Sequence, residues 1–262
     1  MFDSGFGGLT VARAVIDLLP DEHLVYIGDT GRSPYGPRPQ DEVREFAHQL
    51  AWSLVRDFDA KAIVVACNTA SAAALHSLEH ELPVPVFDVV APGARALVRA
   101  TRSGRIGVIG TVGTISSGAY EREVAAIDGN VHLTSAACPG FVEFVERGQT
   151  TGDEVHILAE RLLAPVRAAD VDALLLGCTH YPYLARTIAD VMGHDVTLVS
   201  SADETAFVVR DELSRLGLLR SSSAGRAVHR FLSSGDISWF ADLGGRLLGP
   251  ELRNAEQWHP AD

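Results

Sequence analysis

The chain has 262 residues, enough for one large domain or two smaller ones. Its hydrophobic fraction of 47% is ordinary for a globular protein, and no apolar run reaches the about 18 residues of a membrane-spanning helix. Asp and Glu outnumber Lys and Arg by 34 to 22, and this excess of negative charge disfavours nonspecific binding to nucleic acid. The three cysteines follow no disulfide framework, which predicts a cytoplasmic protein.

Residues 3–8, Asp-Ser-Gly-Phe-Gly-Gly, have the composition of a turn that leads from a strand into a helix starting near Gly8. Only Met1 and Phe2 precede this turn, whereas a buried strand usually has about five residues. We therefore expect either that the natural chain begins upstream or that the first strand is short.

Short β-branched runs then alternate with amphipathic stretches, the pattern of an α/β fold with mostly parallel sheets flanked by helices. The most regular helix is predicted over 40–58, with acidic residues in its first half and one apolar face. A second helix, over 153–169, should be kinked or broken near Pro165. Strands are predicted over 24–28, 62–66, 84–89, 105–110, 131–136, 173–177 and 196–200.

Two segments end an apolar run in a cysteine that small polar residues follow. They read Ala-Cys-Asn-Thr-Ala around Cys67 and Gly-Cys-Thr-His-Tyr-Pro around Cys178. Ligands of open α/β sheets bind at the carboxyl ends of the strands, and the N–H groups of a helix start can lower a thiol pKa. Both cysteines are therefore predicted to take part in chemistry, whereas Cys138 is interpreted as a small buried hydrophobic side chain.

The spacing of these motifs indicates an internal repeat. Asp3 precedes Cys67 by nearly the interval at which Thr111 precedes Cys178. We interpret this as two similar α/β units with an active site in the cleft between them, so that two thiols face one substrate. The first domain is expected to comprise 1–92 and 204–262, and the second 93–203.

The residues alone leave several interpretations open. Asp3 is either a turn or cap carboxylate or a partner of Cys67, and His180 is either a thiol partner or a solvated side chain. The loop at Tyr35 is a lid or a plain turn. The glycines at 5–8 match neither a phosphate loop nor a dinucleotide fingerprint, and no zinc-site spacing occurs, so we expect no metal and no cofactor.

Taken together, and in order along nearly the whole chain, the motifs resemble those of the glutamate racemase family. The two cysteine motifs carry most of the specificity, since the glycine turn alone would be a weak signal. The matching segments are Asp-Ser-Gly at 3–5, Gly-Asp at 28–29, Pro-Tyr-Gly at 34–36, Ala-Cys-Asn-Thr-Ala at 66–70, Gly-Thr at 110–111, Cys-Pro at 138–139 and Gly-Cys-Thr-His-Tyr-Pro at 177–182.

The resemblance implies a cofactor-independent, two-base racemisation that interconverts L- and D-glutamate and supplies D-glutamate for peptidoglycan. Cys67 would take the Cα proton from D-glutamate with help from Asp3, and Cys178 would take it from L-glutamate with help from His180. Glu146 matches a further acidic residue near the second thiol. The residues that match substrate-holding positions are Ser4, Tyr35, Gly36, Asn68, Thr69, Thr111, Thr114 and Thr179.

Alternatives of different classes stay open. A related two-cysteine racemase could act on aspartate or a hydantoin, because pocket size rather than the thiols decides the substrate. A regulatory binding protein is the second alternative, since some members of the family inhibit DNA gyrase. A thiol-redox protein would need closely spaced cysteines, which this chain lacks. The expected partners are glutamate, a second copy of the chain in a homodimer and, in a secondary role, DNA gyrase.

Overall fold

A computed structural model describes residues 1–249, 252 and 254–259 of the chain. The chain divides into two units: unit 1 comprises Met1–Val89 and Ala202–Asp262, and unit 2 comprises Val90–Ser201. The domain boundaries that the sequence predicts, after residues 92 and 203, stay a prediction.

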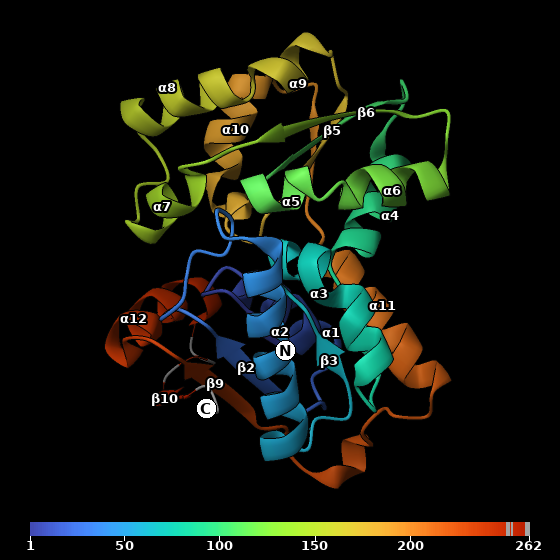
Figure 1. Cartoon of the computed structure of the whole chain (residues 1–262), viewed down its shortest axis with the longest axis vertical. Helices are drawn as coiled ribbons and strands as arrows, with labels where there is room; N and C mark the ends of the chain where they lie inside the picture. Colours follow the sequence, from blue (N-terminus) through green and yellow to red (C-terminus); the bar gives the residue numbers. More distant parts are fainter. Residues whose placement is uncertain (250–251, 253, 260–262) are drawn as a thin grey trace. The chain divides into compact units, whose positions relative to one another are not determined.

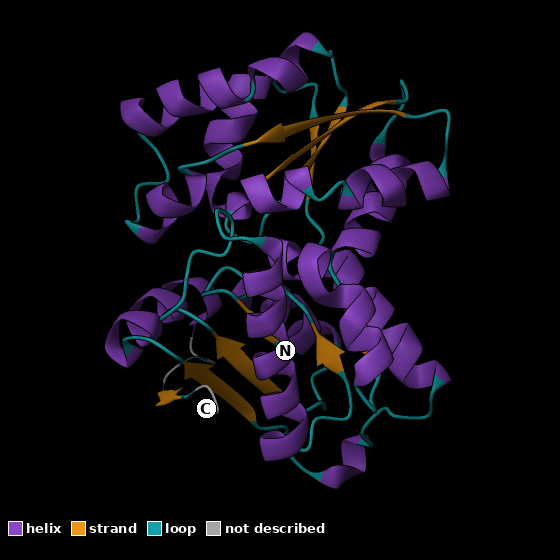
Figure 2. Ribbon diagram, in the orientation of Figure 1, coloured by secondary structure: helices purple, strands orange, loops and turns teal. Residues whose placement is uncertain are grey.

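The strands of unit 1 are all parallel (Figures 1 and 2). Four strands pair in the order β1-β2-β9-β10, and β3 pairs with β4. A parallel bridge between Phe2 and Val65 sets the segment containing β1 beside the one containing β3. The strands are β1 (Phe2–Asp3), β2 (Leu24–Gly28), β3 (Ile63–Val64), β4 (Val86–Phe87), β9 (His229–Ser233) and β10 (Ala255–Gln257).

Helices lie on both sides of this sheet (Figure 2). One face is covered by α2 and α3, which pack on each other, and the other by α1, which packs against α11 and α12. The core under α2 and α3 contains Leu50, Leu54 and Ile63, and it includes Cys67. The helices of unit 1 are α1 (Leu9–Leu18), α2 (Gln40–Phe58), α3 (Asn68–Glu81), α11 (Ala202–Arg215), the 3₁₀ turn η2 (Ser222–Ala224) and α12 (Ile237–Leu248).

Unit 2 has one parallel sheet in the order β6-β5-β7-β8. Its strands are β5 (Arg105–Gly110), β6 (His132–Ala137), β7 (Ala173–Gly177) and β8 (Thr197–Val199). Its helices are α4 (Val90–Ala100), α5 (Val112–Ser116), α6 (Ala119–Ile127), α7 (Phe141–Glu146), α8 (Asp153–Leu162), α9 (Ala164–Ala168), the 3₁₀ turn η1 (Tyr181–Leu184) and α10 (Ala185–Met192).

The two units share one strand order. In each, the first strand lies between the second and the third, and the fourth lies beyond the third: β2-β1-β3-β4 in unit 1 and β6-β5-β7-β8 in unit 2. In this order the chain turns to opposite sides of the first strand, which creates a switch point between strands one and three. Loops after these strands diverge there, so a ligand can approach their carboxyl ends.

The α/β fold class is confirmed, and several elements match their predictions closely. Helix α2 and the strands β2, β5 and β7 have the predicted bounds. The predicted helix 153–169 is broken into α8 and α9, with Pro165 in the first turn of α9. Strand β3 is shorter than predicted, and β1 has only two residues. Within the described part of the chain, no helix is both long and apolar enough to cross a bilayer.

Candidate functional site

The carboxyl ends of β1 and β3 bring Asp3 and Cys67 together in unit 1. The N–H of Ala66 donates to the carbonyl of Phe2 at 2.9 Å, so the residues that follow these two positions emerge at the same edge of the sheet. Cys67 is the N-cap residue of α3, and its sulfur accepts a hydrogen bond from the N–H of Ala70 at 3.5 Å. The switch point of unit 1 therefore holds a carboxylate and a thiol.

A short chain of hydrogen bonds links these two groups through Ser4. The Cys67 thiol donates to Ser4 Oγ at 3.6 Å, and Ser4 Oγ donates to Asp3 Oδ1 at 3.3 Å. The N–H of Gly5 donates to the same carboxylate oxygen at 2.7 Å. Asp3 is fully buried and Cys67 is 5% exposed. The structure thus supports the partner interpretation of Asp3 alongside its role in the turn.

Burial is the largest influence on the Cys67 thiol. Burial, and after it the Asp3 carboxylate, raise the pKa of Cys67 to about 11. Hydrogen bonds from Ala70 and Ser4 act in the opposite direction but are outweighed. The sequence analysis suggests that a helix start can lower this pKa, but burial and a neighbouring negative charge outweigh that effect.

A second buried carboxylate, Asp29, fixes the loop that carries Tyr35 and Gly36. Asp29 accepts hydrogen bonds from the Tyr35 hydroxyl, from Arg32 Nε at 2.6 Å and from Ser234 Oγ at 2.6 Å. Burial, and then Asp29, raise the pKa of Tyr35 well above its usual value, so this hydroxyl stays protonated as a donor. Both Tyr35 and Gly36 are buried. The loop is therefore held in place rather than being a solvated turn.

The first turn of α3 supplies polar groups beside Cys67. Asn68 and Thr69 are each 3% exposed, although polar side chains in a first helical turn are usually solvated. The N–H groups of such a turn have no partner within the helix and point along its axis, which makes a helix start suitable for a carboxylate. Contact of both residues with the substrate stays a prediction.

In unit 2 the corresponding edge is formed by β5, β6 and β7. The register pairs Gly110 with both Ala137 and Gly177, so Thr111, Cys138 and Cys178 follow these strands side by side. Thr111 is the N-cap of α5, and its Oγ1 accepts from the N–H of Thr114 at 3.2 Å. The two threonine hydroxyls lie 3.0 Å apart. Both threonines are buried, at the switch point of this unit.

Cys178 is accompanied by a histidine and a carboxylate. Its sulfur lies 3.9 Å from His180 Nδ1, and His180 Nε2 lies 3.7 Å from Glu146 Oε1. Thr179, Cys178 and His180 are all buried, while the Glu146 side chain is 24% exposed. The arrangement can pass a proton between the thiol and the imidazole, and the carboxylate lies on the far side of the ring. This geometry favours the thiol-partner interpretation of His180 over a solvated side chain.

Cys138 has a different environment. It is 1% exposed, its thiol donates to the carbonyl of Ala136 at 3.9 Å, and burial raises its pKa to about 12. Its carbonyl accepts a hydrogen bond from the Tyr181 hydroxyl at 3.0 Å. The interpretation of Cys138 as a buried, protonated side chain agrees with this environment.

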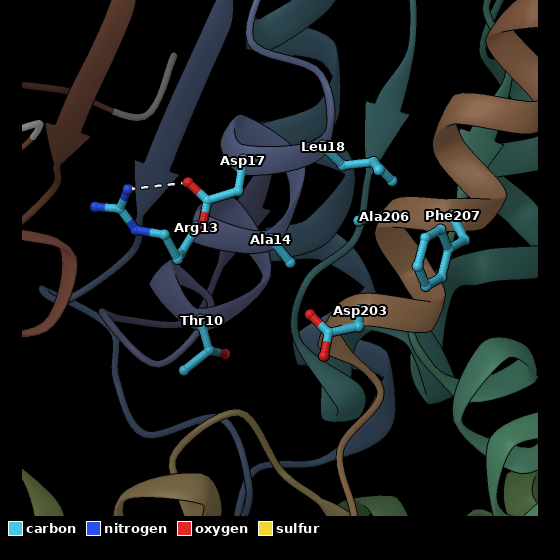
Figure 3. Close-up of a pocket in the computed structure, with 8 residues that line it drawn as sticks. All are labelled: Thr10, Arg13, Ala14, Asp17, Leu18, Asp203, Ala206 and Phe207. Carbon is cyan, nitrogen blue, oxygen red and sulfur yellow. Dashed lines mark hydrogen bonds and ion pairs between the residues drawn. The ribbon is translucent and has the colours of Figure 1, made fainter.

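Two cavities of unit 1 lie away from these groups. A shallow groove of about 300 Å³ runs between α1 and α11, where Thr10, Asp203 and Phe207 face it (Figure 3). A larger cavity, of about 580 Å³, is lined by Met1, Lys61 and other residues at the amino ends of the strands. None of the described residues that line either cavity is a predicted site residue, so we assign neither to the site.

The structure thus collects the predicted residues into two sets, one in each unit. Asp3, Ser4, Tyr35, Gly36, Cys67, Asn68 and Thr69 belong to unit 1, and Thr111, Thr114, Cys178, Thr179 and His180 to unit 2. Sequence reasoning missed that Asp29 is the anchor of the Tyr35 loop. No local signal could have shown its bond to Ser234, because these residues lie far apart in the sequence.

Comparison with known proteins agrees with this architecture. The family model described as Asp/Glu/Hydantoin racemase matches residues 9–207. The chain belongs to this family. It is 54% identical to a glutamate racemase of Parafrankia sp. (strain EAN1pec), over 96% of this chain and 91% of the relative. It is 50% identical to a glutamate racemase of Mycobacterium tuberculosis, over 100% of this chain and 96% of the relative.

A solved structure extends this likeness within the racemase family to three dimensions. A glutamate racemase isoform from Bacillus anthracis superposes with a TM-score of 0.94 at 42% identity. The match covers 100% of this chain and 97% of the other.

Proposed function

We propose that this protein is a glutamate racemase, which interconverts L- and D-glutamate without a cofactor and supplies D-glutamate for peptidoglycan. The observation that carries the proposal is the pair of buried thiols, each at the switch point of one α/β unit and each with its own acid–base partner. The full-length identity to glutamate racemases of other bacteria selects glutamate over aspartate or a hydantoin.

Racemisation needs a base on one face of Cα and an acid on the other. In the proposed reaction the Cys67 thiolate removes the Cα proton of D-glutamate, and the Cys178 thiol delivers a proton to the opposite face. The product is L-glutamate, and the two cysteines have exchanged protonation states. The reverse reaction, starting from the Cys178 thiolate, restores them.

The raised pKa of Cys67 has to be overcome when substrate binds. Glutamate carries an α-ammonium group, and a cation near Asp3 and Cys67 would offset the negative charge that disfavours the thiolate. Asp3 is fully buried beside Ser4 and is the group best suited to attract that cation. The base would therefore form mainly in the complex.

The substrate carboxylates need neutral hydrogen-bond donors, because acidic residues outnumber basic residues in this protein by 34 to 22. The start of α3 and the hydroxyls of Ser4, Thr111 and Thr114 provide them. These donors would also stabilise the negative charge that develops on the carboxylate as the Cα proton leaves.

The decisive experiment follows the circular dichroism of L- or D-glutamate with purified protein and no added cofactor. We expect both enantiomers to approach the racemate, with solvent deuterium entering Cα in D₂O. Cys67→Ser and Cys178→Ser should each lower turnover by about 10²-fold or more in both directions, because the reaction needs an acid and a base together.

Cys138→Ala is the matched control, since it removes a buried thiol that takes no part in the proposed reaction. It should keep turnover close to that of the parent. Racemisation of L-aspartate in preference to L-glutamate would select the alternative substrate. Near-normal turnover in either serine variant would contradict the two-base mechanism.

Three further expectations stay predictions. They are the homodimer, a secondary interaction with DNA gyrase and a cytoplasmic location. Sedimentation of the purified protein addresses the first, and a gyrase supercoiling assay addresses the second.

A further inference from the structure

A tyrosine of the neighbouring strand forms a hydrogen bond to the turn that carries Asp3. Tyr26, in β2, is fully buried, and its hydroxyl donates to the carbonyl of Gly5 at 2.9 Å. Its ring contacts Phe240, stacked at 6.3 Å between ring centres, and Phe231, tilted at 6.3 Å. The two rings hold the tyrosine ring in place, and the hydroxyl meets the turn from a fixed position.

The space around this hydroxyl leaves the turn little freedom. A Cβ at Gly8 would lie 2.7 Å from Asp3 Cβ, 2.9 Å from the Tyr26 hydroxyl and 3.0 Å from Ala66 Cβ. The hydroxyl therefore reaches the point where the carboxylate-bearing turn meets the residue that precedes Cys67. On the other side, a Cβ at Gly28 would lie 2.5 Å from the Gly5 carbonyl oxygen.

We propose that Tyr26 is a positioning residue for the Cys67 centre, because its hydroxyl fixes the Gly5 carbonyl and thereby the turn that sets the Asp3 carboxylate. The N–H of the same residue, Gly5, donates to Asp3 Oδ1 at 2.7 Å, so the bond from Tyr26 and the bond to Asp3 meet on one residue of the turn. Tyr26 does not contact the thiol and acts through the turn.

This inference rests on the proposed function, but its first test does not. Tyr26→Phe keeps the ring and removes only the hydroxyl, so the turn should loosen, Cys67 should gain water and Asp3 should move away. Burial and Asp3 are the two causes that hold Cys67 protonated, so its thiolate fraction should rise. Alkylation of Cys67 by iodoacetamide at pH 8, followed by mass spectrometry, should become about threefold faster or more.

Two controls distinguish a positioning role of Tyr26 from a general loosening of the structure. Cys178, measured in the same samples, should react at its parent rate, because it belongs to unit 2. Leu213→Ala removes a buried side chain of α11 and leaves Tyr26 and its two ring neighbours in place, so it should lower the melting temperature while leaving Cys67 alkylation at the parent rate. A parent-like rate in Tyr26→Phe, or equal acceleration in Leu213→Ala, would overturn the proposal.

The second test measures the isotope effect on racemisation. If proton transfer at Cys67 becomes slower, the primary isotope effect on kcat/KM in Tyr26→Phe should rise with Cα-deuterated D-glutamate and not with Cα-deuterated L-glutamate. An equal change for both enantiomers would contradict a role specific to Cys67. A parent protein that does not racemise glutamate would refute the proposed function alone, because the alkylation result would still decide the role of Tyr26.

Discussion

The two thiols of this protein are set in different chemical surroundings. Cys67 has a fully buried carboxylate as its neighbour through Ser4, whereas Cys178 has an imidazole backed by Glu146. A carboxylate disfavours a thiolate, while an imidazole can accept the thiol proton and then stabilise the charge. The two thiols should therefore respond differently to substitution of their neighbours.

This contrast gives a prediction for Asp3→Asn. The substitution removes the second-largest cause of the raised pKa of Cys67, so that pKa should fall from about 11 toward the ordinary thiol value. The sign follows from charge: a neutral amide no longer repels the thiolate. The pH profile of Cys67 alkylation should therefore shift to lower pH, with Cys178 as the internal reference.

The same variant should nonetheless be a poorer racemase. Without the Asp3 carboxylate, the substrate ammonium loses its partner, so we expect kcat/KM to fall by about 10-fold or more. Because the enantiomers have equal free energies, kcat/KM must fall by the same factor in both directions. An unchanged alkylation profile would show that Asp3 serves only the turn.

At the carboxyl ends of β2 and β7, a glycine lies close to a neighbouring backbone carbonyl group. Gly28 at the end of β2 lies against the Gly5 carbonyl, and Gly177 at the end of β7 lies against the carbonyl of Ile109. A Cβ at Gly177 would lie 2.8 Å from that oxygen. Neither glycine has a positive φ, so space rather than backbone conformation requires it.

We therefore predict that Gly28→Ala is destabilising. The new methyl group would meet both the Gly5 carbonyl and the Phe240 ring, so the turn and α12 would have to shift, at a cost of about 1–3 kcal/mol. Thermal unfolding should show a lower melting temperature, accompanied by lower turnover. Gly129→Ala is the matched control, because nothing lies within 4 Å of its Cβ position, and its melting temperature should stay at the parent value. Equal melting temperatures for the two variants would contradict this account.

The elements also show how far the sequence could predict the structure. The bounds of α2, β2, β5 and β7 follow from local periodicity, because each buries a regular apolar pattern. The thiols could be found because each sits at a strand-to-helix junction with a recognisable local pattern. The anchoring bonds of Tyr26 to Gly5 and of Ser234 to Asp29 could not be predicted, because they join residues 21 and 205 positions apart and no local pattern marks either pair.

At the scale of the whole molecule, the position of the single lysine bears on the prediction that no cofactor takes part. A pyridoxal phosphate enzyme needs a lysine for its Schiff base, and the single lysine, Lys61, lies at the amino end of β3, opposite Cys67. It pairs with Glu22 at 2.6 Å. Within the described residues, no three His, Cys, Asp or Glu side chains gather in a way that could hold a metal ion.

Activity should therefore survive dialysis against EDTA and treatment with hydroxylamine, yet be lost on alkylation of the thiols. The measurement is the rate of racemisation before and after each treatment, with protection by glutamate as the control for alkylation. Loss of activity in EDTA that added metal restores would contradict this prediction.

Lys61 also makes the protein convenient for spectroscopy. Its side chain is 39% exposed and stands at the opposite end of β3 from Cys67. An amine-reactive dye should therefore label one lysine position on unit 1 while both thiols stay unmodified. Glutamate binding could then be followed by fluorescence in a chain whose predicted site residues are all unmodified.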